Sequence, residues 1–132
     1  MTERIDPHIE RFLLDSIDTV PHLEALLLIF RSPEVAWTVE ELAARIYVNE
    51  RQAHGILEDL TRRSLIARVE QASAHSSSRY QYIAKSQAQT ELLENVVQAY
   101  RTQLVQVTRF IHSNASASVR DFARAFRLKD HD

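Results

Sequence analysis

Apolar residues recur every three or four positions along most of this 132-residue chain, which is the spacing of one face of an α-helix. The pattern predicts a first helix over residues 7–16 and a second over residues 21–31. The second helix is apolar on all sides between Leu26 and Phe30, as is typical of a helix at the centre of a small domain. With one Gly and three Pro in the chain, we expect few breaks in these helices.

Two short adjacent helices are predicted next. Thr38 and Glu41 have the spacing of a capping box that starts one helix. Tyr47 and Val48 form a tight turn, after which Asn49 and Gln52 form a second box that starts the other helix. Two helices joined in this way make a helix-turn-helix. Their inward-facing positions are Leu42, Ala43, Ile46, Ala53, Ile56, Leu57 and Leu60.

A hairpin and a long helix complete the predicted fold. Residues 65–69 and 79–83 are predicted strands on either side of a small, polar tip. Ser86 and Gln89 cap a helix over residues 87–112, and Ser118 with Asp121 caps a last short helix. The fold class is therefore mainly α with a small β-hairpin. Residues 1–85 would form a winged helix-turn-helix domain, and residues 86–132 a helical dimerisation and interaction region.

Residues 38–69 resemble the winged helix-turn-helix of bacterial and archaeal transcription regulators of the MarR, PadR and ArsR-like group. The resemblance is carried by Thr38-x-x-Glu41-Leu42-Ala43, Ile46-x-Val48-Asn49, Ala53-x-x-Ile56-x-x-x-Leu60 and Leu65-Ile66. It implies a dimer that places its second helix in the DNA major groove and its hairpin against the flanking backbone. The family usually has Gly where this chain has Ser64, because that helix ends in a left-handed turn.

Several polar residues of this segment are candidates for contact with double-stranded DNA. Arg51 has the geometry to pair with guanine, while Gln52 can pair either with adenine or, as part of the cap, with its own backbone. A plain solvated helix face would show similar residues, and Glu50, Glu58 and Asp59 would repel phosphates. The predicted DNA-binding residues are Thr38, Asn49, Arg51, Gln52, His54, Arg62, Arg63, Arg68, His75 and Arg79.

Gly55 and the hairpin tip leave two interpretations open. A glycine inside a helix costs about 1 kcal/mol relative to Ala, so it permits close approach, either by a neighbouring helix or by a phosphate. Packing against a helix is the commoner reason. The hairpin tip lacks the Arg or Lys that usually enters a minor groove, and a plain flexible loop explains it equally well.

A heptad spacing of apolar residues runs along the predicted C-terminal helix. A helix of this length would extend about 35–40 Å, beyond the small domain it leaves. The apolar seam either packs back on the first two helices or pairs with a second copy, and we favour a homodimer. The predicted dimerisation residues are Leu93, Val97, Tyr100, Leu104, Val107 and Ile111.

Composition excludes several other classes of function. The chain has no Cys, which removes disulfides, thiolate zinc sites and a cysteine nucleophile. One Gly is too few for a phosphate-binding loop, and no catalytic motif is present, so we expect no enzyme and no cofactor. The six His are expected at the surface, and only His54 with Glu58 has a spacing suited to a metal, which alone is weak. The longest apolar run, residues 25–30, is too short for a membrane helix.

The charge distribution keeps two functions open. Residues 1–30 carry two basic and six acidic side chains, the middle of the chain is balanced, and residues 83–132 carry seven basic and five acidic ones. Our first hypothesis is a cytoplasmic, sequence-specific DNA-binding transcription regulator. The alternative is a winged-helix module that binds another regulator or the transcription machinery, with Phe122, Phe126 and the basic tail as the contact to a protein partner.

Overall fold

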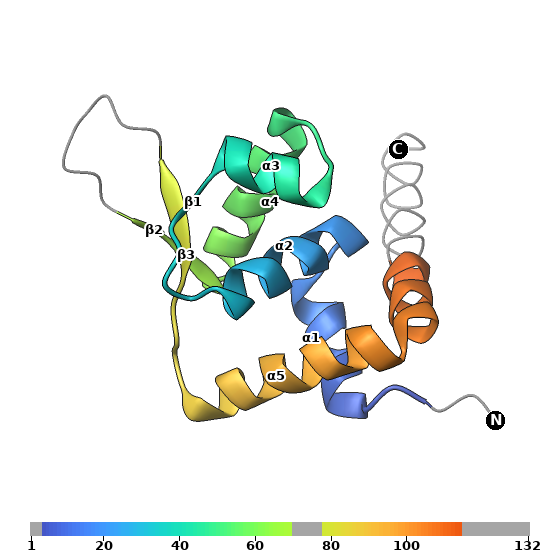
Figure 1. The fold of residues 1–132 in the computed structure, drawn as a ribbon. Coiled ribbons are helices and arrows are strands. Elements are labelled where there is room, and N and C mark those ends of the chain that lie inside the picture. Colours follow the sequence, from blue (N-terminus) through green and yellow to red (C-terminus); the bar gives the residue numbers. More distant parts are fainter. Residues whose placement is uncertain (1–3, 70–77, 115–132) are drawn as a thin grey trace, which may run out of the picture.

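The computed structural model describes residues 4–69 and 78–114, and it shows a winged-helix fold (Figure 1). Residues 104–114 are also helical. The mainly helical fold with a small antiparallel sheet confirms the predicted fold class. The helices and strands are α1 (Pro7–Ser16), α2 (Val20–Arg31), β1 (Trp37–Thr38), α3 (Val39–Ile46), α4 (Glu50–Arg62), β2 (Ile66–Val69), β3 (Arg79–Tyr82) and α5 (Gln87–Thr102).

Side-chain caps start the five named helices. Each capping side chain accepts a hydrogen bond from a backbone N–H of the first turn, which would otherwise have no partner inside the helix. At Thr38 the capping box is complete, because Glu41 also accepts from the Thr38 backbone N–H. The capping residues are Asp6, Thr19, Thr38, Asn49 and Ser86.

The sheet has one strand more than predicted. Its order is β1-β3-β2, with both pairs antiparallel, and Trp37 lies opposite Tyr80. A two-residue strand is too short to show alternation of polar and apolar positions, so β1 has no signal in the sequence. Tyr80 on the central strand is 1% exposed and connects the sheet to the core.

Helix α2 lies at the centre of the fold. It contacts α3, α4, α5 and β3, and Figure 1 shows it crossing between these elements. Leu23, Leu26 and Ile29 are fully buried. The prediction of a central helix that is apolar on all sides is confirmed.

The expectation of one uninterrupted helix over residues 87–112 is wrong. Helix α5 ends at Thr102, and Gln103 has non-helical backbone angles (φ −131°, ψ 44°) before helical residues resume at 104. The bend turns Val107 and Ile111 into the core cluster that also holds Ile5 and Ile9. The side chains of Val107 and Ile111 are each 1% exposed. A straight helix would leave these side chains beyond the domain, so burial of apolar area favours the bend.

Some predictions lie outside the described residues. These are most of the hairpin tip with His75, the last short helix with Phe122 and Phe126, and the basic tail. Within the two described ranges, no helix combines the length and the apolarity needed to cross a membrane.

Candidate nucleic-acid interface

Helix α4 presents one face to the core and the other to solvent. Ala53, Ile56, Leu57 and Leu60 are at most 3% exposed and hold the helix against the rest of the fold. The opposite face is exposed over its first two turns, where it carries Glu50, Arg51, Gln52, His54 and Gly55. The structure therefore brings three predicted DNA-binding residues, Arg51, Gln52 and His54, onto one open surface.

Arg51 and Gln52 have no side-chain partner within the described part of the chain. The predicted second capping box is only half formed. The Asn49 side chain accepts from the backbone N–H of Gln52 at 2.7 Å, but Gln52 makes no return bond. The amide of Gln52 is thus not used by the cap, and both side chains are available to an outside ligand.

Thr38 and Asn49 lie at the starts of α3 and α4, and each uses its side-chain oxygen as a cap. Thr38 is 8% exposed, so most of its side chain is inside the protein. Asn49 is exposed, which leaves its side-chain NH2 group open to solvent.

Two of the predicted DNA-binding arginines connect elements of the fold. Arg63 donates to the carbonyl oxygen of Ser16 at 2.8 Å and pairs with Asp18. Arg79 donates to the carbonyl oxygen of Ala36 at 3.0 Å and to the Glu41 carboxylate at 3.1 Å.

The Glu41 carboxylate that binds Arg79 is also the acceptor of the α3 capping box. The hydrogen bond from the Thr38 backbone N–H is the main reason that the pKa of the Glu41 carboxyl lies below its usual value, and Arg79 lowers it further. Glu41 is therefore ionised at neutral pH and holds Arg79 against α3.

The carboxylates on the second half of α4 are also paired. Glu58 pairs with Arg68 at 2.5 Å and contacts the His54 Nε2 at 3.4 Å, while Asp59 pairs with Arg62. The sequence alone suggested that these carboxylates would repel phosphates. Because basic partners offset their charge, only Glu50 on this helix has no ionic partner in the described residues.

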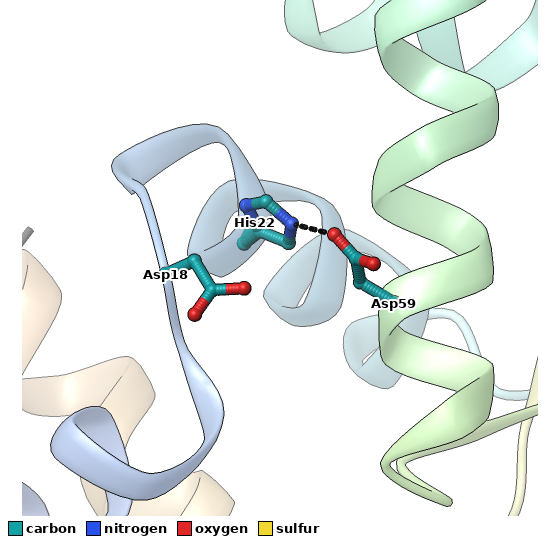
Figure 2. A group of neighbouring side chains, drawn as sticks. All are labelled: Asp18, His22 and Asp59. Atoms are coloured by element: carbon teal, nitrogen blue, oxygen red, sulfur yellow. Dashed lines mark hydrogen bonds and ion pairs between the residues drawn. The ribbon is translucent and has the colours of Figure 1, made fainter. Parts of the chain in front are cut away.

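His22 lies with Asp18 and Asp59 between α2 and α4 (Figure 2). Its Nε2 is 2.8 Å from the Asp59 Oδ2, and its Nδ1 is 2.6 Å from the Thr19 hydroxyl. Since His22 is 8% exposed, the expectation that every His lies at the surface is wrong for this one. Thirty-seven positions separate His22 from Asp59, so no local spacing reveals that contact. Asp18 and His22 are four residues apart, so the expectation that only His54 and Glu58 have a spacing suited to a metal is wrong.

These three side chains have the donor types of a metal site, but their geometry is explained without a cation. Arg62 offsets the charge of Asp59, and Arg63 offsets that of Asp18. The Thr19 hydroxyl lies within hydrogen-bond distance of Nδ1 and the Asp59 carboxylate within hydrogen-bond distance of Nε2, so both ring nitrogens have a partner in the protein. We interpret the group as a hydrogen-bonded clamp between α2 and α4.

Gly55 is exposed on the outer face of α4. A Cβ atom at this position would meet nothing within 4 Å. The packing explanation from the sequence is therefore wrong for the described residues, because no helix among them uses the missing side chain. Close approach by an outside group remains.

An open cleft of about 540 Å³ lies between α1 and the start of α5. Its lining includes the carboxylates of Asp6, Asp15 and Glu91 but only one arginine, Arg11, which pairs with Asp15. This charge pattern is unsuited to a polyanion.

No protein-family model matches the sequence, and no curated protein matches it significantly. Solved structures do match the fold. The structure of Staphylococcus aureus MepR in complex with DNA is 14% identical, covers 86% of this chain and 87% of MepR, and has a TM-score of 0.55. A MarR family protein from Bacillus stearothermophilus is 20% identical, with a TM-score of 0.51 over 94% of this chain and 81% of that protein. RV1404 from Mycobacterium tuberculosis is 16% identical, covers 94% of this chain and 81% of RV1404, and has a TM-score of 0.51.

Proposed function

We propose that this chain, which has the winged-helix fold seen in a MarR family protein, is a sequence-specific DNA-binding transcription regulator. It acts as a homodimer, without catalytic activity of its own, in the cytoplasm. Helix α4 enters the major groove of double-stranded DNA, and the wing formed by β2 and β3 lies against the flanking backbone. The complex of MepR with DNA, whose fold this chain shares, supports this choice of ligand.

The observation that carries the proposal is the free pair Arg51 and Gln52 on the first turn of α4. In a helix that enters the major groove, the N-terminal residues contact base edges. Arg pairs with guanine and Gln with adenine through two hydrogen bonds, so both need side chains that the protein itself does not use. Both side chains are exposed, and neither has a partner among residues 4–69 and 78–114.

Electrostatics on α4 are consistent with the proposal. Arg62 and His54 on α4, and Arg68 on β2, contact the carboxylates of α4, which removes much of the repulsion that Glu58 and Asp59 would exert on phosphates. Arg62 and Arg68 remain exposed and can contact a phosphate with their outer N–H groups. DNA binding by five other predicted residues stays a proposal. Four of these have internal partners, namely Thr38, Asn49, Arg63 and Arg79. The fifth, His75, lies outside the described residues.

The test is selection of duplexes from a random-sequence library, followed by fluorescence anisotropy with the enriched duplex. We expect an enriched sequence and an affinity that falls steeply with salt, because bound phosphates release counterions. Arg51→Ala should weaken binding to the enriched duplex by about 1–3 kcal/mol. Lys85→Ala removes one charge from an exposed position outside α4 and serves as the matched control.

Two results would contradict the proposal. If no duplex is enriched and the chain has no salt-dependent affinity for DNA, the fold serves protein docking instead. If Arg51→Ala and Lys85→Ala reduce affinity equally, binding is a general effect of charge and α4 does not read bases.

A further inference from the structure

Tyr47, in the turn between α3 and α4, combines a left-handed backbone with a side chain that is almost fully exposed. Its backbone lies in the left-handed region (φ 60°, ψ 47°), and its side chain is 92% exposed. It is the most exposed of the large hydrophobic side chains in the described part of the chain. From its sequence context, Tyr47 is expected only to form a tight turn with Val48.

The left-handed conformation has a clear local role, but tyrosine is a poor residue for it. The N–H groups of Tyr47 and Val48 both donate to the carbonyl oxygen of Ala43, which ends α3 and turns the chain toward α4. Gly or Asn usually occupies such a position because a bulky side chain is strained there. Ser64, at the other end of α4, is the second residue with positive φ, but its side chain is small and polar.

The exposed ring of Tyr47 also gains no stabilisation from burial, because almost all of its apolar surface stays in contact with water. Its hydroxyl has no hydrogen-bond partner within residues 4–69 and 78–114. A strained, exposed aromatic residue contributes neither to packing nor to the turn, and such residues cluster at functional sites. The left-handed turn holds it two residues before the Asn49 cap, beside the proposed reading end of α4.

We propose that Tyr47 contacts the DNA backbone next to the bases read by α4, which deepens the proposed function and rests on it. The phenol O–H donates a hydrogen bond to a phosphate oxygen, and the ring packs against the adjacent deoxyribose. Contacts of this kind fix the position of a protein on the duplex and carry no sequence information. Tyr47 is therefore a positioning residue for Arg51 and Gln52.

The experiment measures duplex affinity and thermal stability of the full chain for a set of variants. Tyr47→Phe keeps the ring and the strain but lacks the hydroxyl, and we expect about tenfold weaker binding to specific and random duplexes alike. Because tyrosine is uncharged, the slope of affinity against salt should not change, whereas loss of a phosphate-binding cation reduces it.

Tyr47→Gly separates the DNA contact from damage to the fold. Glycine relieves the left-handed strain, so the Tm should rise by about 3–6 °C while affinity for all duplexes falls more than in Tyr47→Phe. Ser64→Gly is the matched control, since it also relieves a positive φ and should raise the Tm without weakening DNA binding.

The outcomes are distinguishable. If the wild-type chain does not bind DNA, both the proposed function and this inference fail. If the wild-type chain binds DNA and the Tyr47 variants bind equally well, only this inference is overturned. A loss of affinity that occurs together with a lower Tm in both Tyr47 variants also overturns it, because tyrosine would then be a structural residue.

Discussion

At the scale of single residues, the same side-chain type has different roles along this chain. Arg51 has no partner in the part of the chain that the structure describes, whereas Arg63 binds the carbonyl of Ser16 and Arg79 binds that of Ala36. The sequence predicts DNA binding for all three, because each is an arginine in the predicted helix-turn-helix or hairpin. The two carbonyl groups lie 47 and 43 positions away from Arg63 and Arg79 in the sequence, so no local pattern could separate these roles.

Gly55 allows a prediction at this scale. Gly55→Ala should stabilise the fold by about 1 kcal/mol, because alanine is the better helix former and its Cβ meets no neighbour within 4 Å. If DNA approaches the outer face of α4 closely, the same variant should bind the enriched duplex more weakly. Chemical denaturation and anisotropy measure the two effects.

The control for Gly55 is Ala44→Gly, a change in the opposite direction on the exposed face of α3. It should destabilise the fold by about 1 kcal/mol and leave the surface of α4 unchanged. A Gly55→Ala protein that is more stable and binds DNA as well as wild type would show that no group approaches α4 at this position.

At the scale of elements, local rules identified most helix starts. Thr38, Asn49 and Ser86 were predicted as caps, and each accepts the expected backbone hydrogen bond. Caps act over three residues, so sequence spacing is enough to find them. The strand β1 and the bend at Gln103 depend on distant partners, and the sequence showed neither.

The hydrogen-bonded clamp between α2 and α4 should make the stability of the fold depend on pH. Burial acts to raise the pKa of the Asp59 carboxyl, but hydrogen bonds and charges from His22 and Arg62 outweigh it and lower that pKa below its ordinary value of 3.8. A group whose pKa is lowered by folding stabilises the native state above its unfolded pKa and loses this contribution as pH falls through the folded value. The contribution of Asp59 should therefore begin to fall below about pH 4 and should be lost only below the lowered pKa of the folded state.

Urea denaturation of wild type and Asp59→Asn at pH values between 3 and 6 would measure this contribution. The wild-type chain should be the more stable of the two at pH 6, and the difference should shrink below pH 4. Asp15→Asn is a suitable control, because Asp15 is exposed on α1 and its only partner among the described residues is Arg11. An equal difference at pH 3 and pH 6 would show that the Asp59 charge does not hold α2 to α4.

At the scale of the whole molecule, much of the apolar seam that was predicted to form a homodimer is buried within one chain. Leu93, Val107 and Ile111 are at most 1% exposed, and Val97 and Tyr100 line a groove with α2 residues of the same chain. The seam therefore packs back over much of its length, one of the two arrangements that its spacing allowed. Leu104 and Val105 remain 48% and 57% exposed at the bend.

We expect a dimer in which this exposed apolar pair is covered by the second copy. Light scattering should give twice the mass of one chain at micromolar concentration. Substitution of both Leu104 and Val105 by Ser should shift the mass toward the monomer without loss of helix content, because neither side chain belongs to the core.

Ile83→Ser, at another exposed apolar position outside the C-terminal helices, should leave the dimer unchanged. A monomer mass for wild type across this range would refute the dimer. A dimer that tolerates the double substitution would place the interface elsewhere on the molecule.

The sequence by itself determined the order of the helices, the helix-turn-helix with its two caps, and the hairpin, because these depend on contacts within a few residues. The family resemblance implied a left-handed turn at Ser64, and the φ of Ser64 is 61°. Only the tertiary structure decided which charges are internally paired, that His22 is buried, and that the C-terminal helix bends at Gln103. These features arise from groups far apart in the chain, whose meeting depends on how the whole core packs.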